Sequence, residues 1–571
     1  MGANATRSEP GTAMRALARP VSVFAGIVRA TSGWRRALLA FAAGVLSILA
    51  FAPFFFSPVL LATLPVLLWL SEAGSDRRGT TAARSVSWLP APGDLWRGFK
   101  IGWWFGFGFH FAGLYWIGGA FLVQAEVFAW LLPVAVTLMP AGLALFHGAA
   151  VAVVACVSGS ALTRVLVLAL AISASEWLRG NILTGFPWNV LGYALTYPLV
   201  LMQSAAVLGI FGLTLATVVI FCTPVAVLAE AKANRRSRPG LVIVACTAAP
   251  VLAMVAYGVL VLAQPGSQPV PGVRLRLVQP SIPQVDKFDP EKRREIFRRH
   301  LDLSRRGPGG ADAGFQNVTH VIWPEAALPF LGLRSPEVLR QIGDEFPDDV
   351  VLVLGTLRLD GPLVRDGRKL KVYNSAATIS GTGGIVDHYD KVHLVPFGEY
   401  LPFQETLESL GLEQLTRVRG GFAVGRTPRP PLRIPGLPQT DLLICYEVIF
   451  PDEVVTGKRR PDLLVNITND AWYGKSTGPF QHFHQARVRS VEQGIPMIRV
   501  ANNGVSASVD ARGRIIAKLG LDEVGAVDSE LHQPIAPTTY AKFGDNLYWG
   551  IWLILLALLN IAGCRKKLLG I

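Results

Sequence analysis

Charged residues are scarce in this sequence. Asp, Glu, Lys and Arg make up 16% of its 571 residues, whereas 51% of the residues are hydrophobic. Soluble globular chains carry roughly 25% charged residues, so this composition argues against an ordinary soluble protein. The chain is also longer than one typical domain, and we therefore expect at least two structural units.

Cysteines are few and form no cluster. None belongs to a CxxC pair or lies beside a group of histidines, so we expect neither a zinc site nor a disulfide framework. We also predict that the protein needs no metal and no cofactor. The five cysteines are Cys156, Cys222, Cys246, Cys445 and Cys564.

The net charge of +14 would by itself suggest a nucleic acid or an anionic surface as partner. However, much of the excess of Lys and Arg lies beside apolar runs, where these residues set membrane topology and contact lipid headgroups. We therefore expect a membrane as partner and no nucleic acid.

Long apolar segments are abundant, mostly in the first half of the chain. A helix needs about 20 apolar residues to cross a bilayer, so the pattern predicts about eight transmembrane helices. We assign about seven to residues 37–263 and one to residues 547–571, after a basic, weakly ordered N-terminal extension at 1–36. The segments are Ala37–Ala52, a run from Val59, Gly98–Val123, Phe128–Val157, Val165–Leu178, Tyr197–Leu228, Leu241–Ala263 and Leu547–Ala562.

The basic residues test this count independently. If the N-terminus and its extension lie in the cytoplasm and the helices alternate, Lys and Arg gather in the inside segments, as the positive-inside rule requires. Residues 264–546 then lie on the outer face of the membrane. The inside residues are Arg77, Arg78, Arg84, Arg97, Arg164, Lys232, Arg235, Arg236, Arg238, Arg565, Lys566 and Lys567.

Arg179 is the exception, because it falls in a short outside loop, one helical turn after Glu176. Ionisable groups at membrane depth tend to be paired or functional, so this pair is a second point of interest.

Residues 264–546 have a different pattern, in which short β-rich runs alternate with polar stretches of helical pattern such as Asp289–Ser304 and His482–Gln493. Strands that alternate with helices predict a layered α/β domain. The β-rich runs are Leu275–Val278, His320–Trp323, Val350–Gly355, Ser375–Ile379, Leu442–Tyr446, Leu463–Thr468 and Met497–Val500.

Three strand ends in this domain finish on chemically useful residues. Taken singly, each has an ordinary structural explanation, such as a solvated carboxylate, a surface Lys–Asp pair or a packed core thiol. Together they indicate a shared site. The residues are Glu325 after His320–Trp323, Lys391 and Glu399 within Tyr389–Tyr400, and Cys445 after Asp441–Ile444.

This combination resembles the nitrilase superfamily, whose hallmark is a Glu, a Lys and a Cys at three successive strand ends in that chain order. The closer resemblance is to its membrane branch, the apolipoprotein N-acyltransferase family, because Lys391–Glu399 and Asn469–Trp472 match the paired signature of that family. The resemblance implies a bundle of about eight transmembrane helices joined to an αββα sandwich. It also implies that the protein lies in the bacterial inner membrane, with residues 264–546 on the periplasmic side.

One position departs from the family pattern. Phe288 stands where the family would have a Trp implicated in substrate handling. An aromatic side chain is retained, so the departure bears on substrate preference rather than on reaction type.

The family roles agree with elementary chemistry. An acyl chain leaves an ester most easily in two steps, through a thioester on a nucleophile such as Cys445. A cation such as Lys391 would lower the pKa of that thiol, and Glu325 would accept the thiol proton and return one to the leaving alcohol. Lys391 would also stabilise the oxyanion, an effect typically worth ~3 kcal/mol per donor.

Three further residues are expected to support this chemistry. Glu399 would orient Lys391 or share its charge. Tyr446 and Glu447, directly after the nucleophile, resemble family positions needed for activity, and we assign them to the second substrate.

A Cys–His arrangement is the alternative, because His393, His482 and His484 belong to the same domain and a His activates the Cys of papain-like enzymes. The sequence carries no local signature of that class, and the spacing of His482 and His484 is poor for a metal. We expect these histidines to be structural. By topology Cys445 is the one thiol on the oxidising side, which favours a nucleophile over packing.

The resemblance therefore implies a ping-pong acyl transfer from a membrane phospholipid to the N-terminal amino group of the diacylglyceryl Cys of an apolipoprotein. Nothing in the sequence demands assembly, so we expect a monomer. The enzymatic alternative is a membrane-anchored amidase or nitrilase that uses the same Glu, Lys and Cys. The non-enzymatic alternative is a transporter or scaffold, which the intact set of three residues disfavours.

Overall fold

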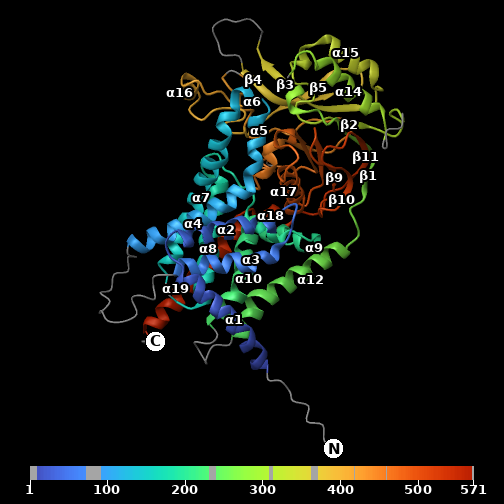
Figure 1. Cartoon of the computed structure of the whole chain (residues 1–571). Coiled ribbons are helices and arrows are strands. Elements are labelled where there is room, and N and C mark those ends of the chain that lie inside the picture. Colours follow the sequence, from blue (N-terminus) through green and yellow to red (C-terminus); the bar gives the residue numbers. More distant parts are fainter. Residues whose placement is uncertain are drawn as a thin grey trace, which may run out of the picture. The chain divides into compact units, whose positions relative to one another are not determined.

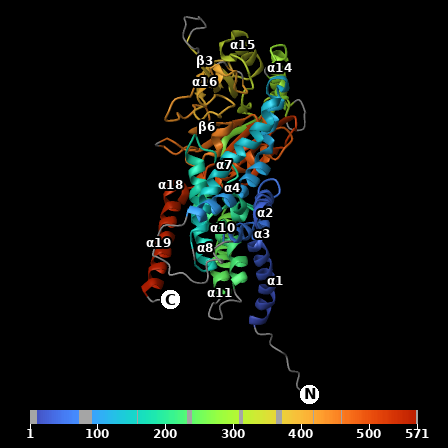
Figure 2. The ribbon, with the colours of Figure 1, turned by 60° about the vertical axis from the view of Figure 1, so that its left-hand side comes forward.

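The computed structural model describes residues 10–72, 92–157, 159–230, 239–287, 289–307, 313–361, 371–416, 418, 420–457 and 459–568. Phe288 lies outside these residues, as do Arg77, Arg78, Arg84, Lys232, Arg235, Arg236 and Arg238 of the topology argument. The chain divides into two compact units (Figures 1 and 2). The first comprises Met1–Tyr115, Val136–Ala263 and Phe543–Ile571, and the second comprises Trp116–Ala135 and Gln264–Lys542.

The first unit is helical. Six helical spans are long and apolar enough to cross a membrane, and two shorter apolar helices bring the number among the described residues to eight. This confirms the predicted bundle. Its helices are α1 (Pro10–Ala30), α2 (Gly33–Ser47), η1 (Ile48–Ala50), η2 (Ser57–Val59), α3 (Leu60–Glu72), α4 (Pro92–Leu114), α7 (Leu132–Ala155), α8 (Ala161–Asn181), η6 (Leu191–Leu195), α9 (Leu199–Met202), α10 (Ala205–Glu230), α11 (Pro239–Ile243), η7 (Val244–Ala248), α12 (Ala249–Ala263) and α19 (Asn546–Leu568).

The N-terminal extension differs from its prediction. We expected residues 1–36 to be weakly ordered, but α1 is a helix that packs against α3 and α10. Its buried side chains Ala18, Ala25 and Val28 recur at helical spacing, which places them on one face. The density of basic residues in this segment concealed that apolar stripe.

Glu176 and Arg179 form a buried pair in α8, with 3.9 Å between Oε1 and Nη2. Arg179 donates to the carbonyl oxygens of Phe186 and Trp188, while Glu176 accepts from the backbone N–H of Leu191. The pair therefore holds the segment after α8 in place, and its contacts are structural.

The second unit contains two β-sheets. The strand order is β11-β1-β2-β3-β4-β5 in one sheet and β10-β9-β8-β7-β6 in the other. The strands are β1 (Pro269–Gln279), β2 (His320–Ile322), β3 (Val351–Asp360), β4 (Lys371–Ile379), β5 (Ile385–Asp390), β6 (Thr440–Ile444), β7 (Leu463–Thr468), β8 (Met497–Ala501), β9 (Ser506–Val509), β10 (Ile515–Leu519) and β11 (Gly525–His532).

Short helices complete this unit. Trp116–Ala135, which joins two apolar helices, belongs here because Trp116 packs on Tyr473 and donates to Gln481. The predicted domain limits at 264 and 546 stay predictions. The helices are α5 (Gly118–Leu122), α6 (Ala125–Phe128), η5 (Ala129–Leu131), α13 (Gln284–Lys287), α14 (Arg293–Arg305), η9 (Gly332–Arg334), α15 (Pro336–Glu345), α16 (Gln404–Ser409), η10 (Cys445–Ile449), η11 (Asp470–Tyr473), α17 (Gly478–Gln493) and α18 (Thr539–Phe543).

Two apolar cores hold the layers together. One lies between the sheets and joins Leu277 and Ile322 to Ile444 and Val465. The other joins the first sheet to α14 and α15, with Trp323 at its centre. On the second sheet, α17 packs against β8. This is the αββα sandwich that the resemblance implied.

Candidate active site

The sandwich brings the three predicted strand-end residues together. Glu325 follows β2, Lys391 follows β5 and Cys445 follows β6 directly. Their exposed fractions are 7%, 1% and 5%, so the site is buried. The Nζ atom of Lys391 lies 3.8 Å from Oε1 of Glu325, and the charges of both residues act on the Cys445 thiol. Strands of two different sheets therefore contribute to one site.

Glu399 holds Lys391 in place. Its Oε2 atom lies 2.9 Å from Nζ of Lys391 and also accepts a hydrogen bond of 2.8 Å from the backbone N–H of Val395. Burial alone would lower the pKa of Lys391, but the carboxylates of Glu399 and Glu325 outweigh it and raise that pKa. Lys391 is therefore a permanent cation at neutral pH, and Glu399 is the nearer of its two carboxylate partners.

Asn374 is a member of the site that sequence reasoning missed. Its Nδ2 atom donates to Oε1 of Glu325 at 2.7 Å and to Oε1 of Glu399 at 2.8 Å. The residue lies in β4, whose register places it opposite Leu357 of β3. The only sequence signal was an amide directly before the predicted run Ser375–Ile379, which is too common a pattern to indicate a site.

Lys287 is a second buried cation that the sequence analysis did not single out. It ends α13 and donates from Nζ to the backbone carbonyl oxygen of Glu325 at 2.9 Å. Burial lowers its pKa to about 7, against the opposing effects of Glu325 and Cys445. The spacing from Lys287 to Glu325 carries no motif, so only the fold could reveal it.

The pKa of Cys445 is shifted in the direction opposite to the one that we expected. We expected Lys391 to lower the pKa of the thiol, but burial and the carboxylate of Glu325 outweigh that cation and raise it to about 12. The resting sulfur is therefore a neutral thiol. A nucleophile in this state needs a base to take its proton during the attack.

The pKa of Glu325 fits it to that task. Burial raises the pKa of its carboxyl group, although the cation of Lys391 opposes the rise. A carboxylate with a raised pKa is a better proton acceptor, and general bases work best with a pKa close to the working pH. The site thus pairs a neutral thiol with a carboxylate of increased basicity.

Cys445 also has an unusual backbone conformation, with φ of 51°. Residues other than Gly rarely adopt this left-handed region, and such strain gathers at functional sites, where the surrounding structure enforces it. Here β6 ends and η10 begins, so the chain turns sharply at the thiol.

Glu447 is part of the wall of the site. It is fully buried and accepts hydrogen bonds from the Tyr389 hydroxyl and from the backbone N–H groups of Val392 and Ile444. These bonds tie the segment that carries Lys391 to the strand that carries Cys445. Glu447 therefore positions both residues, and its carboxylate faces no open space for a substrate.

Tyr446 and His393 belong to an aromatic cluster beside that wall. His393 stacks on Phe450 with 3.9 Å between ring centroids, and Tyr446 lies edge-on to Phe450 at 5.0 Å. His393 is also paired with Glu453 at 2.8 Å.

The two ring nitrogens of His482 contact a carboxylate and a backbone carbonyl group. Its Nδ1 atom lies 2.9 Å from Oδ1 of Asp470, and its Nε2 atom lies 3.2 Å from the backbone carbonyl oxygen of Cys445. Asp470 is also paired with Arg499 at 2.8 Å. Burial alone would raise the pKa of Asp470, but Arg499 and His482 lower it to about 2. This geometry disfavours the Cys–His alternative.

His484 is likewise buried in α17. Among the described residues, no three His, Cys, Asp or Glu side chains come together in a way that could hold a metal ion.

Comparison with known proteins covers both units. Residues 274–536 match the carbon-nitrogen hydrolase family model, and residues 43–223 match the model of the apolipoprotein N-acyltransferase N-terminal domain. The chain is 45% identical over 526 residues to an apolipoprotein N-acyltransferase of Rhodopseudomonas palustris, which covers 92% of this chain and 94% of that protein. A protein of the same name from Bradyrhizobium diazoefficiens is 45% identical over 520 residues, covering 90% and 93%.

Among solved structures, an amidase from Nesterenkonia sp. is 20% identical, with a TM-score of 0.33. The match covers 50% of this chain and 97% of the amidase.

Proposed function

Because the chain belongs to the apolipoprotein N-acyltransferase family, we propose that it moves an acyl chain from a membrane phospholipid to a lipoprotein through a thioester on Cys445. The protein is a bacterial membrane acyltransferase of the carbon-nitrogen hydrolase superfamily that N-acylates lipoproteins. The acyl donor, the intermediate and the roles of individual residues are the proposal.

In the first step, Glu325 accepts the proton of the Cys445 thiol while the sulfur attacks the ester carbonyl carbon of the phospholipid. Lys391 stabilises the negative charge that develops on the carbonyl oxygen. The C–O bond then breaks, Glu325 returns its proton to the glycerol oxygen, and a lysophospholipid leaves. The acyl chain remains on Cys445 as a thioester.

In the second step, the free amino group of the diacylglyceryl Cys at the lipoprotein N-terminus attacks the thioester carbon. Glu325 accepts a proton from the nitrogen, the C–S bond breaks, and the proton returns to Cys445. The products are an amide and the original thiol, so no further reactant is needed.

One combination of groups supports this mechanism above all. The Cys445 thiol is buried and neutral, the Glu325 carboxyl group has a raised pKa, and the permanent cation of Lys391 lies 3.8 Å from that carboxylate. Asn374 and Glu399 fix the positions of Glu325 and Lys391, while Glu447 holds the two segments together. Tyr446 and Phe288 are assigned to substrate contact on the family resemblance.

We further propose that the enzyme is a monomer of the inner membrane, with the unit that carries Cys445 on the periplasmic side. The distribution of Lys and Arg along the chain supports this orientation. Both lipid substrates lie in the bilayer, so an active site joined to membrane helices meets them without their leaving the membrane.

Intact mass spectrometry tests the proposal. Purified enzyme incubated with phospholipid vesicles should gain the mass of one acyl chain on Cys445 and lose it when a diacylglyceryl-Cys peptide is added. Cys445→Ala should show neither change, because a thioester needs the sulfur.

Cys222→Ala is the matched control, since that thiol is also buried but lies in α10. An active preparation without an adduct would overturn the mechanism, and release of ammonia from small amides would favour the amidase alternative.

A further inference from the structure

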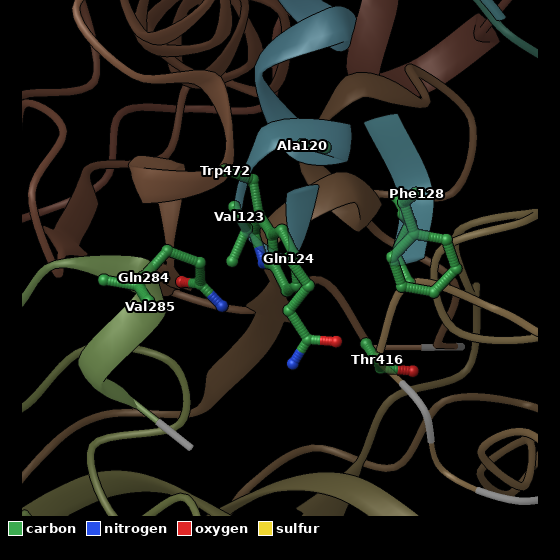
Figure 3. Close-up of a pocket in the computed structure, with 9 residues that line it drawn as sticks. Ala120, Val123, Gln124, Phe128, Gln284, Val285, Thr416 and Trp472 are labelled. Atoms are coloured by element: carbon green, nitrogen blue, oxygen red, sulfur yellow. The ribbon is translucent and has the colours of Figure 1, made fainter. Parts of the chain in front are cut away.

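The mechanism above does not use a cavity of about 320 Å³ inside the second unit. The cavity is lined by the turn between α5 and α6, by α13, by the loop at Leu415 and Thr416, and by Trp472 of η11 (Figure 3). Ligand sites in proteins usually have volumes of about 300–1,000 Å³, so this space can hold part of a lipid.

A buried hydrogen-bond donor points into this space. The side chain of Gln284 is only 6% exposed, and its Oε1 atom accepts a bond of 2.7 Å from Asn469. Its Nε2 atom has no hydrogen-bond partner among the described residues. In Figure 3 this nitrogen points toward the space beside Gln124 and Thr416. An unsatisfied buried amide is costly, so its placement here indicates a ligand that supplies an oxygen acceptor.

Apolar side chains line part of the cavity. Val123, Val285 and Trp472 line the cavity, and Val285 is 64% exposed although it is hydrophobic. A hydrocarbon chain in the cavity would remove this apolar surface from water. An oxygen acceptor joined to a hydrocarbon chain is the chemistry of a fatty acyl ester.

Two of the elements that line the cavity also reach the candidate active site. Gln284 and Val285 belong to α13, the short helix whose last residue, Lys287, donates to the carbonyl oxygen of Glu325. Trp472 is followed by Tyr473, whose pKa is raised by burial and by the neighbouring Cys445. The opposite wall is the turn between two apolar spans, Gly93–Leu122 and Ala125–Ala155, which are long enough to cross a membrane. A lipid bound in the cavity would therefore contact two elements that also interact with Glu325 and Cys445.

We propose that this cavity binds the glyceryl ester of a membrane lipid, with the Gln284 amide donating to an ester carbonyl oxygen and Val123, Val285 and Trp472 contacting the adjoining acyl chain. The inference rests on the proposed function and deepens it, because it assigns one part of the lipid to one set of residues. The phospholipid donor and the diacylglyceryl acceptor both carry this group, so the test must separate the two reaction steps.

Two variants address the site in different ways. Gln284→Glu keeps an oxygen that can accept from Asn469 but removes the donor that faces the cavity. Val123→Trp fills the cavity. Val127→Trp is the matched control, because Val127 lies on α6 close to Val123 in the chain but is 40% exposed and does not line the cavity.

The first measurement is the rate at which Cys445 is acylated, by phosphatidylethanolamine in mixed micelles and by p-nitrophenyl butyrate, which has no glyceryl group. The second is the rate of transfer from the pre-formed acyl-enzyme to a diacylglyceryl-Cys peptide. We expect Gln284→Glu and Val123→Trp to lose about tenfold in one of the two glyceryl-dependent rates, the range expected when a hydrogen bond or a fitted chain is lost. Acylation by the p-nitrophenyl ester should stay unchanged.

A loss confined to phospholipid acylation identifies the donor as the occupant, and a loss confined to transfer identifies the acceptor. Either result supports the proposal. Equal losses with the p-nitrophenyl ester would show damage to the catalytic group instead, and no loss in either glyceryl-dependent rate would show that the cavity is unused. Both of these results would overturn it.

Photolabelling keeps the proposal testable if the enzyme transfers no acyl chain at all. A phosphatidylcholine with a diazirine near the ester end of one chain should label residues 120–128 or 284–285, and Val123→Trp should reduce that labelling while Val127→Trp does not. Absence of label in both segments would overturn the cavity assignment, whatever the outcome for the acyl-enzyme.

Discussion

Two buried groups of charged and polar side chains act on Cys445, and they differ in how completely their charges are paired. The reactive group consists of Glu325, Lys391, Glu399 and Asn374. The scaffold group consists of Asp470, His482, Arg499 and Thr468.

The difference lies in the two carboxylates. Asp470 is bonded to Thr468, His482 and Arg499, and its pKa is lowered to about 2. The carboxylate of Glu325 shares the cation of Lys391 with the carboxylate of Glu399, and burial raises the pKa of Glu325. Burial alone therefore does not distinguish a catalytic carboxylate from a structural one. The supply of cations and donors decides whether the group can take up a proton.

The largest expected effect comes from removing the base. Glu325→Gln should slow acylation of Cys445 by about 10²–10⁴-fold, the usual contribution of a general base, because the thiol is neutral at rest. The amide can still accept from Asn374, so the melting temperature should change little. The measurements are acyl-enzyme formation by rapid-quench mass spectrometry and thermal unfolding in detergent. An acylation rate equal to that of the unchanged enzyme would remove Glu325 from this role.

The converse result is expected in the scaffold group. Asp470→Asn leaves Arg499 buried without its counterion, which should cost about 3–5 kcal/mol and lower the melting temperature by roughly 6–20 °C. Asp522→Asn is the control, because it breaks a surface pair with Lys475 and should cost at most about 1 kcal/mol. The acylation rate per folded molecule should survive in Asp470→Asn. If it falls as far as in Glu325→Gln at an unchanged melting temperature, the two groups are not functionally distinct.

The residues of the reactive group could be predicted from the sequence more completely than those of the scaffold group, and the reason is physical. Lys391 was found through its family motif, because it follows the mostly polar β5. Glu325 and Cys445 follow β2 and β6, which are short, buried and largely apolar runs. Such runs are visible without a structure, and so are the residues at their ends. Asp470, His482 and Arg499 come from three elements whose pairing depends on the register of β7 and β8 and on the packing of α17.

The same reasoning explains the omissions in the fold. The strands β9, β10 and β11 were not predicted, because β10 is largely exposed and β9 and β11 mix polar with apolar residues. β5 was missed because its sequence is mostly polar. Lys287 and Asn374 were missed because each acts through hydrogen bonds with residues distant in the chain.

The smallest expected effect concerns Lys287. This residue is a second cation beside the reactive group, and its charge depends on pH. Below its pKa of about 7 the ammonium is charged and lowers the pKa of Glu325, whereas above that pH it becomes neutral. Lys287→Met should therefore raise the pKa of Glu325 and move the acidic limb of the acylation rate to higher pH.

The acylation rate of Lys287→Met, relative to that of the unchanged enzyme, should therefore be lower near pH 6 than at pH 8–9. Lys292→Met is the matched control, since Lys292 is exposed on the same segment and is paired with Asp286. A loss that is the same at every pH would mean that Lys287 acts only by holding the backbone of Glu325. The protonation of Glu325 would then depend on Lys391 and Glu399 alone, and the contrast with Asp470 would rest on those two side chains.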